Sequence, residues 1–336
     1  MRVLIPAAGQ GTRLYPQTHT KPKAMVRLAG RPILGHILDS VAETDVDEVI
    51  LVVGGPMQDQ ITEYAVEEYG GRFDFEFVEQ EAAEGLGHSV YQARHVAADE
   101  PVFIALGDML FENGYEQFLE AHRSLGDVDG SLGVKRVDDP QHYGVAELGS
   151  DDHIVDLVEK PDDPPSEYAI SGVYIIEDSE SLFQALEHLV EKDIRGAGDE
   201  YQLTDALSRM VDQGADLHTF EVEDWYDCGR PETLLEANRV LLADRTTSVP
   251  DDLKGSVVVP PVDIGSDVTL ESSVVGPNVS VDDGASIENS ILSDAILGEG
   301  AAVETVNLDE SIIGDNATVT GDANQLNVGD NSSINL

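Results

Sequence analysis

Apolar residues in the first third of the chain form two alternating patterns. Short apolar runs predict strands at residues 3–5, 48–53, 73–78 and 102–106. Between them, apolar residues recur every three or four positions and predict helices at residues 33–41, 61–69 and 88–98. Because strands alternate with helices and most of the strands are apolar throughout, we expect a parallel sheet covered by helices on both faces.

The middle of the chain mixes the two patterns with less regularity. Strands are predicted at residues 131–137, 144–148, 154–158 and 168–176. Helices are predicted at residues 181–189, 202–213 and 231–243. Pro231 suits the first turn of the last helix. The chain from residue 1 to residue 245 is therefore predicted to form an α/β domain with a mixed, mainly parallel sheet.

Beyond about residue 250 the composition changes. This part of the chain has no aromatic residue, His, Arg, Cys or Met, and its one lysine is Lys254. An aliphatic residue followed by glycine recurs, as in Ile264-Gly265 and Leu297-Gly298, with short β-branched runs between. This imperfect hexapeptide repeat predicts a left-handed parallel β-helix over residues 246–336, with a linker near residues 244–256. A β-sandwich is the alternative, disfavoured by the lack of aromatic residues and the repeated glycines.

The chain of 336 residues has 66 Asp and Glu against 19 Lys and Arg, a net charge of -47. High net charge is typical of disordered chains, but 41% of the residues are apolar and arranged periodically. We therefore expect a folded protein with a carboxylate-rich surface, as halophilic proteins have. The same charge argues against binding to nucleic acid or anionic membranes.

The sequence favours a cytoplasmic location. Cys228 is the one cysteine, so no intramolecular disulfide is possible and a reducing compartment fits. No apolar run approaches the roughly 18 residues of a membrane-spanning helix, and the start of the chain does not have the pattern of a signal peptide.

The stretch that precedes Asp39 differs in charge from the rest of the chain. Asp39 is the first acid, although the overall frequency (38 × 66/336) predicts about seven acids before it, and six cations lie in the stretch. Gly9 and Gly11 follow the apolar run at residues 3–5, and glycines let backbone N–H groups approach an anion closely. Gly107-Asp108 follows another apolar run, at residues 102–106. Ends of parallel strands share one edge of a sheet, so both segments are expected at a single phosphate-binding site.

The glycine turn fits neither the Walker A loop nor the dinucleotide fingerprint. The longer string AAGQGTRLYPQTHTKPKAM closely resembles the signature of the sugar-1-phosphate nucleotidyltransferases, and the resemblance extends over residues 1–245. It implies a Rossmann-like catalytic domain that joins a nucleoside triphosphate to a sugar 1-phosphate and releases pyrophosphate. It also implies a nucleotide-binding loop with the residues Ala8, Gly9, Gly11 and Thr12, and catalytic side chains at Arg13 and Lys23.

Further segments extend the resemblance. In the family, a glutamine before a small-residue turn reads a pyrimidine base, which implies nucleotide contacts at Gln80 and Gly85. The Gly-Leu-x-His string at residues 85–88 resembles especially the long-form glucose-1-phosphate thymidylyltransferases. Asp108, together with Asp227 in the segment Trp-Tyr-Asp-Cys-Gly, matches the family's Mg²⁺-binding carboxylates. Sugar-phosphate contacts are implied at Gly144, Glu159, Lys160 and Gly172.

We therefore expect a thymidylyltransferase that uses glucose 1-phosphate, with Mg²⁺ as cofactor. UTP in place of dTTP, and N-acetylglucosamine 1-phosphate in place of glucose 1-phosphate, are the alternatives. Acetyl transfer by the β-helix is not expected, because no histidine follows His218. A non-catalytic regulatory subunit would be expected to lose one of Arg13, Lys23, Asp108 or Asp227. The β-helix is expected to serve homo-oligomer assembly.

Overall fold

The computed structural model describes residues 1–322, apart from Gln10, Asp224, Asp244, Thr246, Ser248, Asp251 and the side chain of Asp151. The chain divides into two compact units. One contains Met1–Arg27 and Arg31–Ala237, and the other contains Leu28–Gly30 and the chain from Asn238 onward. The domain boundaries predicted at residues 1–245 and 246–336 stay a prediction, and residues 323–336 of the predicted β-helix lie outside the described part of the chain.

The first unit is built on a nine-stranded mixed sheet in the order β10-β9-β11-β6-β1-β4-β5, with β8 joined to β11 and β12 joined to β8. The parallel part consists of β1 (Arg2–Pro6), β4 (Glu48–Val53), β5 (Asp74–Glu79) and β6 (Val102–Ala105). The remaining strands are β8 (Gly130–Arg136), β9 (Gly144–Leu148), β10 (Ile154–Glu159), β11 (Tyr168–Ile176) and β12 (Leu217–Glu221). Strand β11 pairs antiparallel with β6, so the predicted mixed sheet is confirmed.

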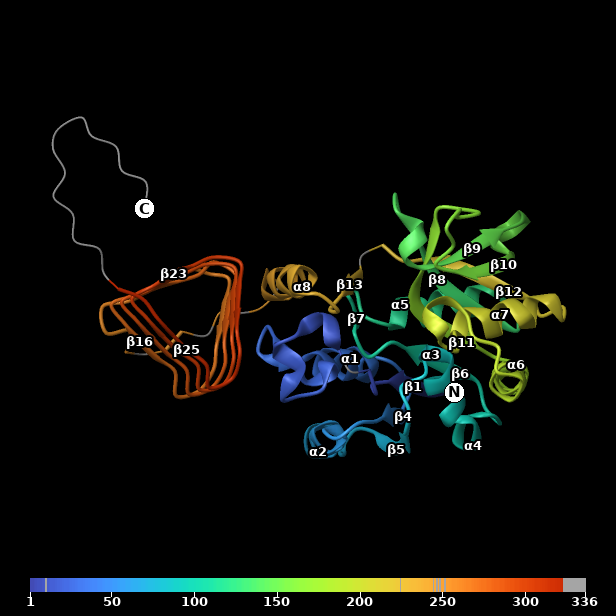
Figure 1. Cartoon of the computed structure of the whole chain (residues 1–336), viewed down its shortest axis with the longest axis horizontal. Coiled ribbons are helices and arrows are strands. Elements are labelled where there is room, and N and C mark those ends of the chain that lie inside the picture. Colours follow the sequence, from blue (N-terminus) through green and yellow to red (C-terminus); the bar gives the residue numbers. More distant parts are fainter. Residues whose placement is uncertain are drawn as a thin grey trace. The chain divides into compact units, whose positions relative to one another are not determined.

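Helices lie on both faces of this sheet (Figure 1). The helices of the first unit are α1 (Ile33–Ala42), α2 (Gln58–Tyr69), α3 (Leu86–Gln92), α4 (Arg94–Ala97), α5 (Glu116–Leu125), α6 (Ser179–Lys192) and α7 (Leu203–Asp212). Helix α8 (Pro231–Ala243) crosses the boundary between the two units at Ala237. The single helix predicted at residues 88–98 is wrong in one respect, because the chain breaks at Ala93 into α3 and α4. Among the described residues, no helix is both long and apolar enough to cross a bilayer.

Several short elements add to the predicted set. Strands β2 (Arg27–Leu28) and β3 (Arg31–Pro32) pair with each other, and β7 (Met109–Phe111) pairs antiparallel with β13 (Trp225–Asp227). Two- and three-residue strands carry too little pattern to be predicted from sequence. The β7–β13 pair is important for the site, because it brings the chain at Asp108 close to Asp227.

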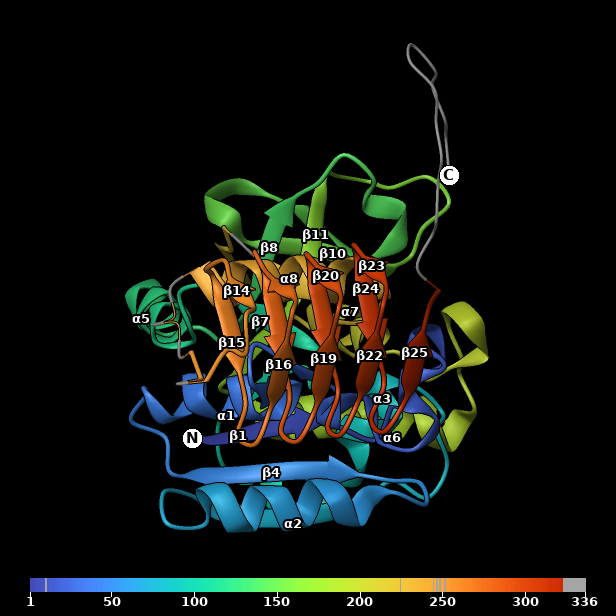
Figure 2. The ribbon, with the colours of Figure 1, turned by 90° about the vertical axis from the view of Figure 1, so that its left-hand side faces the viewer.

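The second unit is a left-handed parallel β-helix, as predicted. Its three sheets have the orders β14-β17-β20-β23, β15-β18-β21-β24 and β16-β19-β22-β25. Figure 1 shows its triangular cross-section, and Figure 2 shows the stacked coils. The strands are Val257–Val258, Val262–Ile264, Thr269–Glu271, Val274–Val275, Val279–Val281, Ser286–Glu288, Ile291–Leu292, Ala295–Leu297, Ala302–Glu304, Asn307–Leu308, Ser311–Ile313 and Thr318–Thr320, numbered β14 to β25 in chain order.

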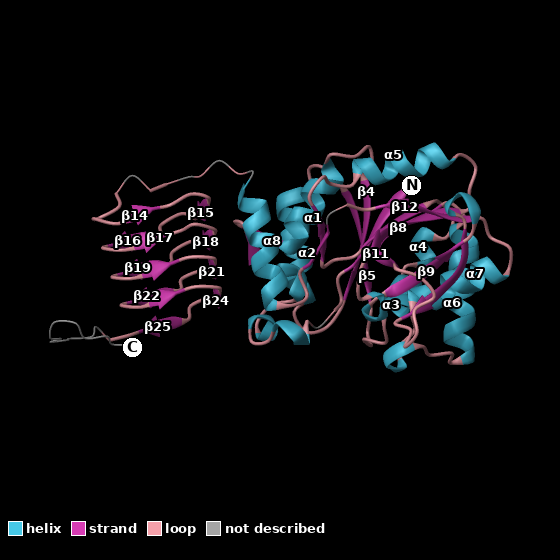
Figure 3. Cartoon of the chain, turned by 90° about the horizontal axis from the view of Figure 1, so that it is seen from above, coloured by secondary structure: helices cyan, strands magenta, loops and turns pink. Residues whose placement is uncertain are grey.

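Successive coils of the β-helix stack in register. Val262 pairs with Val279, Val279 with Ala295, and Ala295 with Ser311. Figure 3 shows the stacked coils from a second side. The lumen is aliphatic, with a buried core of Val, Ile, Leu and Ala side chains. The absence of aromatic residues from this part of the sequence is therefore explained by the narrow lumen.

The corners of the β-helix account for its many Asp, Asn and Gly residues. At one corner, successive coils place a residue with positive φ, between 55° and 69°, at Asp267, Gly284, Gly300 and Asn316. Asn, Asp and Gly tolerate this left-handed conformation best. A buried serine ladder repeats in the same way, since the backbone N–H of Ser273 donates to Ser256 Oγ (3.1 Å) and that of Ser290 donates to Ser273 Oγ (3.1 Å).

Candidate active site

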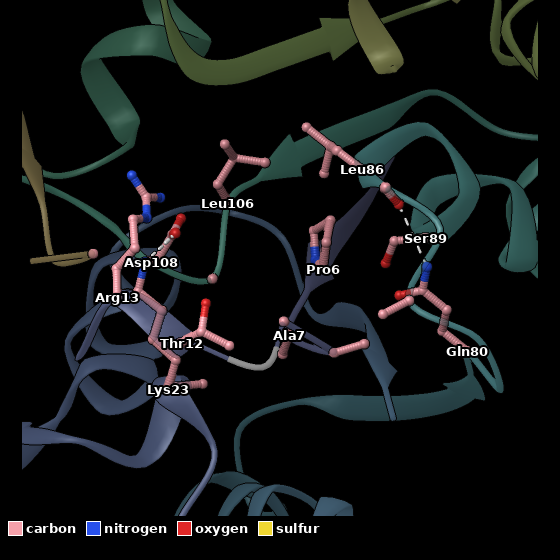
Figure 4. A pocket seen from close by; sticks show the side chains of 18 of the residues that line it. Pro6, Ala7, Thr12, Arg13, Lys23, Gln80, Leu86, Ser89, Leu106 and Asp108 are labelled. Carbon is pink, nitrogen blue, oxygen red and sulfur yellow. Dashed lines mark hydrogen bonds and ion pairs between the residues drawn. The ribbon is translucent and has the colours of Figure 1, made fainter. Parts of the chain in front are cut away.

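A cavity of about 550 Å³ lies at the carboxyl ends of β1 and β6. The two strands pair in parallel, and the N–H of Gly107 donates to the carbonyl of Pro6 (3.3 Å), so the two glycine segments meet at one edge of the sheet as predicted. Figure 4 shows Arg13, Lys23 and Asp108 at one end of the cavity and Gln80, Leu86 and Ser89 at the other. The lining residues are Pro6, Ala7, Ala8, Gly9, Gly11, Thr12, Arg13, Lys23, Ala24, Gln80, Ala83, Gly85, Leu86, Ser89, Leu106, Gly107, Asp108, Glu200 and Gly229.

The glycine loop reaches the cavity with its backbone. A Cβ atom added at Gly9 would meet no atom within 4 Å, so the backbone there faces open space. Gly11 has φ 62°, and a Cβ there would lie 2.9 Å from Lys23 Cβ, so both conformation and packing require glycine. The Thr18 hydroxyl donates to the Gly11 carbonyl (2.7 Å) and the Leu14 N–H donates to the same oxygen (2.9 Å). These contacts fix the turn that carries Thr12 and Arg13.

Lys23 lies between two carboxylates. Its ammonium donates to Asp108 and lies 3.8 Å from Asp227 Oδ1. The residue is only 8% exposed, because Lys23–Met25 forms a short 3₁₀ helix that packs against α1. The N–H of Gly229 donates to Asp227 Oδ1 (2.8 Å), and the N–H of Cys228 donates to the carbonyl of Asp108 (2.9 Å). These backbone bonds and the buried lysine hold both carboxylates toward a common point.

The two carboxylates fit the predicted divalent cation. They face one positive charge from two segments of the chain, and both offer oxygen atoms, which Mg²⁺ prefers in proteins.

Cys228 lies between Asp227 and Gly229 in sequence but has a different environment. Its thiol is fully buried, and this burial raises its pKa well above the usual range despite the nearby Lys23. The thiol is therefore neutral and not a nucleophile.

The far end of the cavity is organised around the Gln80 amide. Gln80 is buried, and its Nε2 lies 3.4 Å from the Gly85 carbonyl and 3.1 Å from Nδ1 of His88. His88 is fixed in turn by Gln92, whose Nε2 lies 2.8 Å from the other ring nitrogen. Ser89 Oγ is buried and has no hydrogen-bond partner among the described residues. A polar atom of this kind, in the wall of a cavity, is available to a ligand.

Arg195 joins this end of the cavity to a second loop. Its Nη2 donates to Glu84 Oε1 (2.9 Å) and to the Tyr201 hydroxyl (3.1 Å), and its guanidinium lies 4.3 Å from the Tyr201 ring centre. Backbone bonds from Tyr201 to Glu84 and from Gly87 to Tyr201, both 2.8 Å, complete the connection. The segment from Glu84 to Gly87 is thus held against residues 193–201.

The residues predicted to bind the sugar phosphate do not line the cavity itself. Glu159 pairs with Gly144 across β9 and β10, and its Oε2 accepts from the Thr204 hydroxyl (2.7 Å). Lys160 has positive φ and places its Nζ 3.0 Å from Glu159 Oε1. Gly172 contacts the cavity wall, because the Leu106 N–H donates to its carbonyl (3.3 Å).

Sequence reasoning missed several residues of the cavity wall. Gly229 is required, since a Cβ there would lie 2.6 Å from Asp227 Oδ1 and 2.9 Å from Lys23 Nζ. Gly229 could have been predicted from the sequence, because it ends the segment Trp-Tyr-Asp-Cys-Gly that contains Asp227. Ser89 and Glu200 also line the cavity, and neither has a distinctive sequence signal.

Comparison with known proteins agrees with this architecture. Residues 2–244 match the family described as nucleotidyl transferase. The chain therefore belongs to the nucleotidyltransferase family, in its sugar-1-phosphate group, and the resemblance found in the sequence is confirmed.

Three curated relatives are similar to the chain. The low-salt glycan biosynthesis nucleotidyltransferase Agl11 of Haloferax volcanii is 30% identical over 73% of this chain and 67% of its own length. The glucose-1-phosphate thymidylyltransferase of Streptomyces antibioticus is 33% identical over 73% of this chain and 67% of its own length. The bifunctional protein GlmU of Methanococcus vannielii is 33% identical over 77% of this chain. The matched region covers only 59% of the length of GlmU.

A solved structure has the same fold. A UDP-glucose pyrophosphorylase complexed with UDP-glucose superposes with a TM-score of 0.62 over 73% of this chain and 99% of its own, at 25% identity.

Proposed function

We propose that this protein transfers a nucleotidyl group from a pyrimidine nucleoside triphosphate, with dTTP favoured, to glucose 1-phosphate, and releases pyrophosphate. One observation carries the proposal. A single cavity has a glycine loop with Arg13 and Lys23 at one end and a buried, oriented glutamine amide at the other. This arrangement suits the triphosphate and the base of one nucleotide.

The reaction needs positive charge more than a base. The attacking oxygen of a sugar 1-phosphate is already ionised, so the main barrier is the approach of two polyanions. In the proposed site, the backbone of Ala8, Gly9, Gly11 and Thr12 cradles the nucleotide, and Arg13 and Lys23 stabilise the charge on the phosphates. Asp108 and Asp227 would hold Mg²⁺, which neutralises phosphate charge when bound.

The base contact explains why dTTP and UTP are both candidates. The Gln80 amide and the backbone at Gly85 would pair with the imide edge that thymine and uracil share. One methyl group is worth about 1–3 kcal/mol of discrimination at most. Similarity to a thymidylyltransferase supports dTTP, and similarity to a UDP-glucose pyrophosphorylase supports UTP as the alternative. Ser89 is a further candidate for a nucleotide contact.

The sugar 1-phosphate is proposed to bind beside the cavity wall. Glu159 would accept hydrogen bonds from sugar hydroxyls, Lys160 would bind the phosphate, and Gly144 and Gly172 would allow close approach of the ring. Tyr143 supports this placement, because its ring packs 5.5 Å from that of Trp225 on β13, the strand that carries Asp227. N-acetylglucosamine 1-phosphate is the alternative acceptor.

We also propose that the protein is cytoplasmic and assembles as a homo-oligomer through its β-helix. The proposed assembly is supported by an outward-facing column of apolar residues on the β-helix. Val257, Val274 and Ile291 are in register on successive coils, and Val257 and Ile291 are 55% and 51% exposed. Sedimentation of the wild type and Ile291→Asp tests the assembly.

The specificity is tested by measuring pyrophosphate release over a matrix of substrates in molar KCl with Mg²⁺. The triphosphates are dTTP, UTP, CTP, ATP and GTP, and the acceptors are the 1-phosphates of glucose, galactose, N-acetylglucosamine and mannose. We expect the highest kcat/KM for dTTP with glucose 1-phosphate. Higher kcat/KM with UTP would establish the alternative, and turnover with purine triphosphates alone would contradict the role of Gln80.

A further inference from the structure

We propose a second metal site, separate from the cavity, in which His153, Asp216 and His218 bind a transition-metal ion such as Zn²⁺. His153 follows a short 3₁₀ turn, Ser150–Asp152, ahead of β10, and Asp216 and His218 lie at the start of β12. The two imidazoles and the carboxylate offer one ligand atom each, and these three atoms lie within 4.8 Å of one another.

The spacing of the ligand atoms fits a tetrahedral ion. Nδ1 of His153 lies 3.2 Å from Oδ1 of Asp216, and Nε2 of His218 lies 3.1 Å from the same oxygen. Two ligands at about 2.0–2.1 Å from a tetrahedral ion are about 3.3 Å apart. The two rings pack edge to face with centres 5.6 Å apart, and the three ligand atoms lie within 4.8 Å of one another. Small side-chain movements would therefore complete the coordination.

The backbone holds the three residues in place. His153 and His218 form an isolated antiparallel bridge, and the Thr219 hydroxyl donates to the carbonyl of Asp152 (3.4 Å). The N–H of Asp216 donates to Asp129 Oδ2 (2.7 Å), which fixes the start of β12. The site thus joins two segments that are distant in sequence.

The imidazole nitrogens are available for a metal. Nδ1 of His218 has no hydrogen-bond partner in the described part of the chain, so the ring can carry its proton there and offer Nε2 to an ion. His153 is 40% exposed at the side chain and Asp216 is 52% exposed, which leaves an entry path from solvent. On binding, each imidazole would offer an unprotonated ring nitrogen to the ion in place of its hydrogen bond to the carboxylate.

The ligand set selects a different metal from the one proposed at Asp108 and Asp227. Two imidazoles and one carboxylate suit Zn²⁺, Co²⁺ and Ni²⁺, whereas Mg²⁺ prefers oxygen ligands alone. Three protein ligands leave a position for water. The site contains none of the residues assigned to nucleotide or sugar phosphate. Metal binding is therefore expected to affect the stability of β12 and not the reaction. Among the named strands, β12 pairs only with β8, so a metal that ties β12 to His153 would hold it more firmly in the sheet.

The test uses the untagged full-length protein, freed of metal by a chelator, and titrates it with Co²⁺ while recording visible absorption. Four- or five-coordinate Co²⁺ bound by imidazole is expected to give an intense band at one equivalent. In His153→Gln and Asp216→Asn, the apparent dissociation constant is expected to rise at least about tenfold. His95→Gln, which replaces an exposed histidine on α4, is the matched control and should titrate like the wild type.

Thermal unfolding provides a second readout. One equivalent of Zn²⁺ is expected to raise the Tm of the wild type and of His95→Gln, and not that of His153→Gln. Because His153 and Asp216 are partly exposed, these variants should fold, and their melting without metal checks this. Co²⁺ binding of equal strength in the wild type, His153→Gln and Asp216→Asn would overturn the proposal, as would a Zn²⁺ shift that survives in both variants.

Discussion

Lys23 and the two carboxylates around it show how single residues determine this site. Lys23 is buried, and its ammonium is held by Asp108 and by Asp227 at 3.8 Å. The same carboxylates are proposed to bind Mg²⁺. In the free protein, therefore, the lysine neutralises the charge that the metal would otherwise meet.

Replacing Lys23 by Met is expected to separate metal binding from turnover. The Mg²⁺ affinity of the free protein should rise about 30-fold, since the repulsion between a divalent ion and a unit charge about 4 Å away is worth about 2 kcal/mol even in water. The turnover number should fall by about 100-fold or more, because the stabilising charge on the phosphates is lost. Calorimetry and steady-state kinetics measure the two effects, with Lys192→Met on α6 as control. Weaker Mg²⁺ binding in Lys23→Met would contradict the shared-carboxylate arrangement.

Asp205, in the first turn of α7, gives a prediction for pH dependence. Burial, and then the charge of Glu159, raise its pKa in the folded protein. A raised pKa means that the folded state binds the Asp205 proton more tightly than the unfolded state does. This tighter proton binding stabilises the fold below about pH 4, and the stabilisation is lost as the pH rises through the folded pKa. Ionised Asp205 therefore destabilises the fold at pH 7.

Asp205→Asn is accordingly expected to have a higher Tm than the wild type at pH 7, with the difference shrinking as the pH approaches 4. Melting curves of both proteins between pH 4 and pH 8 in molar KCl measure this. A lower Tm for Asp205→Asn at pH 7 would show that the carboxylate's contacts outweigh its burial.

Among the elements, the loops around the cavity depend on contacts between distant segments. Arg195 connects residues 193–201 to Glu84, which lies 111 positions earlier in the chain. The connection supports the turn at Gly85, where a Cβ atom would lie 2.6 Å from the Tyr201 carbonyl.

Arg195→Gln is expected to raise the KM for the nucleoside triphosphate about tenfold and to change kcat less, because the arginine positions the base-binding turn and touches no reacting atom. Steady-state kinetics with the triphosphate varied would measure this. Arg136→Gln removes the same charge from an exposed pair with Glu167 and should leave KM unchanged. An unchanged KM in Arg195→Gln would mean that the turn holds its shape without the arginine.

The elements also show what sequence can and cannot reveal. The buried strands β1, β4 and β6 were predicted because their apolar runs are continuous. Helix α5 was not, because its buried apolar stripe is limited to Phe118 and Leu119. The Arg195 contacts and the pairing of Lys23 with two aspartates depend on tertiary placement, which periodicity does not encode. Residues at strand ends were predictable, since parallel strands bring their carboxyl ends together.

For the whole molecule, the dominant feature is a net charge of -47. Self-repulsion of this size destabilises a compact chain at low salt and is screened as the Debye length falls from about 10 Å at 0.1 M to about 3 Å at 1 M. The β-helix was predicted from composition and repeated glycines, because its narrow lumen accepts only aliphatic residues and its corners favour Asn, Asp and Gly.

The Tm is expected to rise between 0.1 M and 2 M KCl, by about 1–2 °C for each kcal/mol of repulsion removed. Differential scanning calorimetry measures the shift, with sucrose of equal osmolality as a control that does not screen charge. A Tm that falls as KCl increases would contradict the halophilic character proposed for the surface.

The central claim is that the cavity at the ends of β1 and β6 catalyses nucleotidyl transfer with Asp108 and Asp227 as metal ligands. The measurement that tests it most directly is pyrophosphate release from dTTP and glucose 1-phosphate by the wild type, Asp108→Asn and Asp227→Asn, each shown to be folded by its melting curve. We predict turnover that requires both substrates in the wild type and its loss, by at least about 1,000-fold, in both variants. Wild-type rates in both variants, or no turnover by the wild type with any triphosphate and sugar 1-phosphate, would contradict the account.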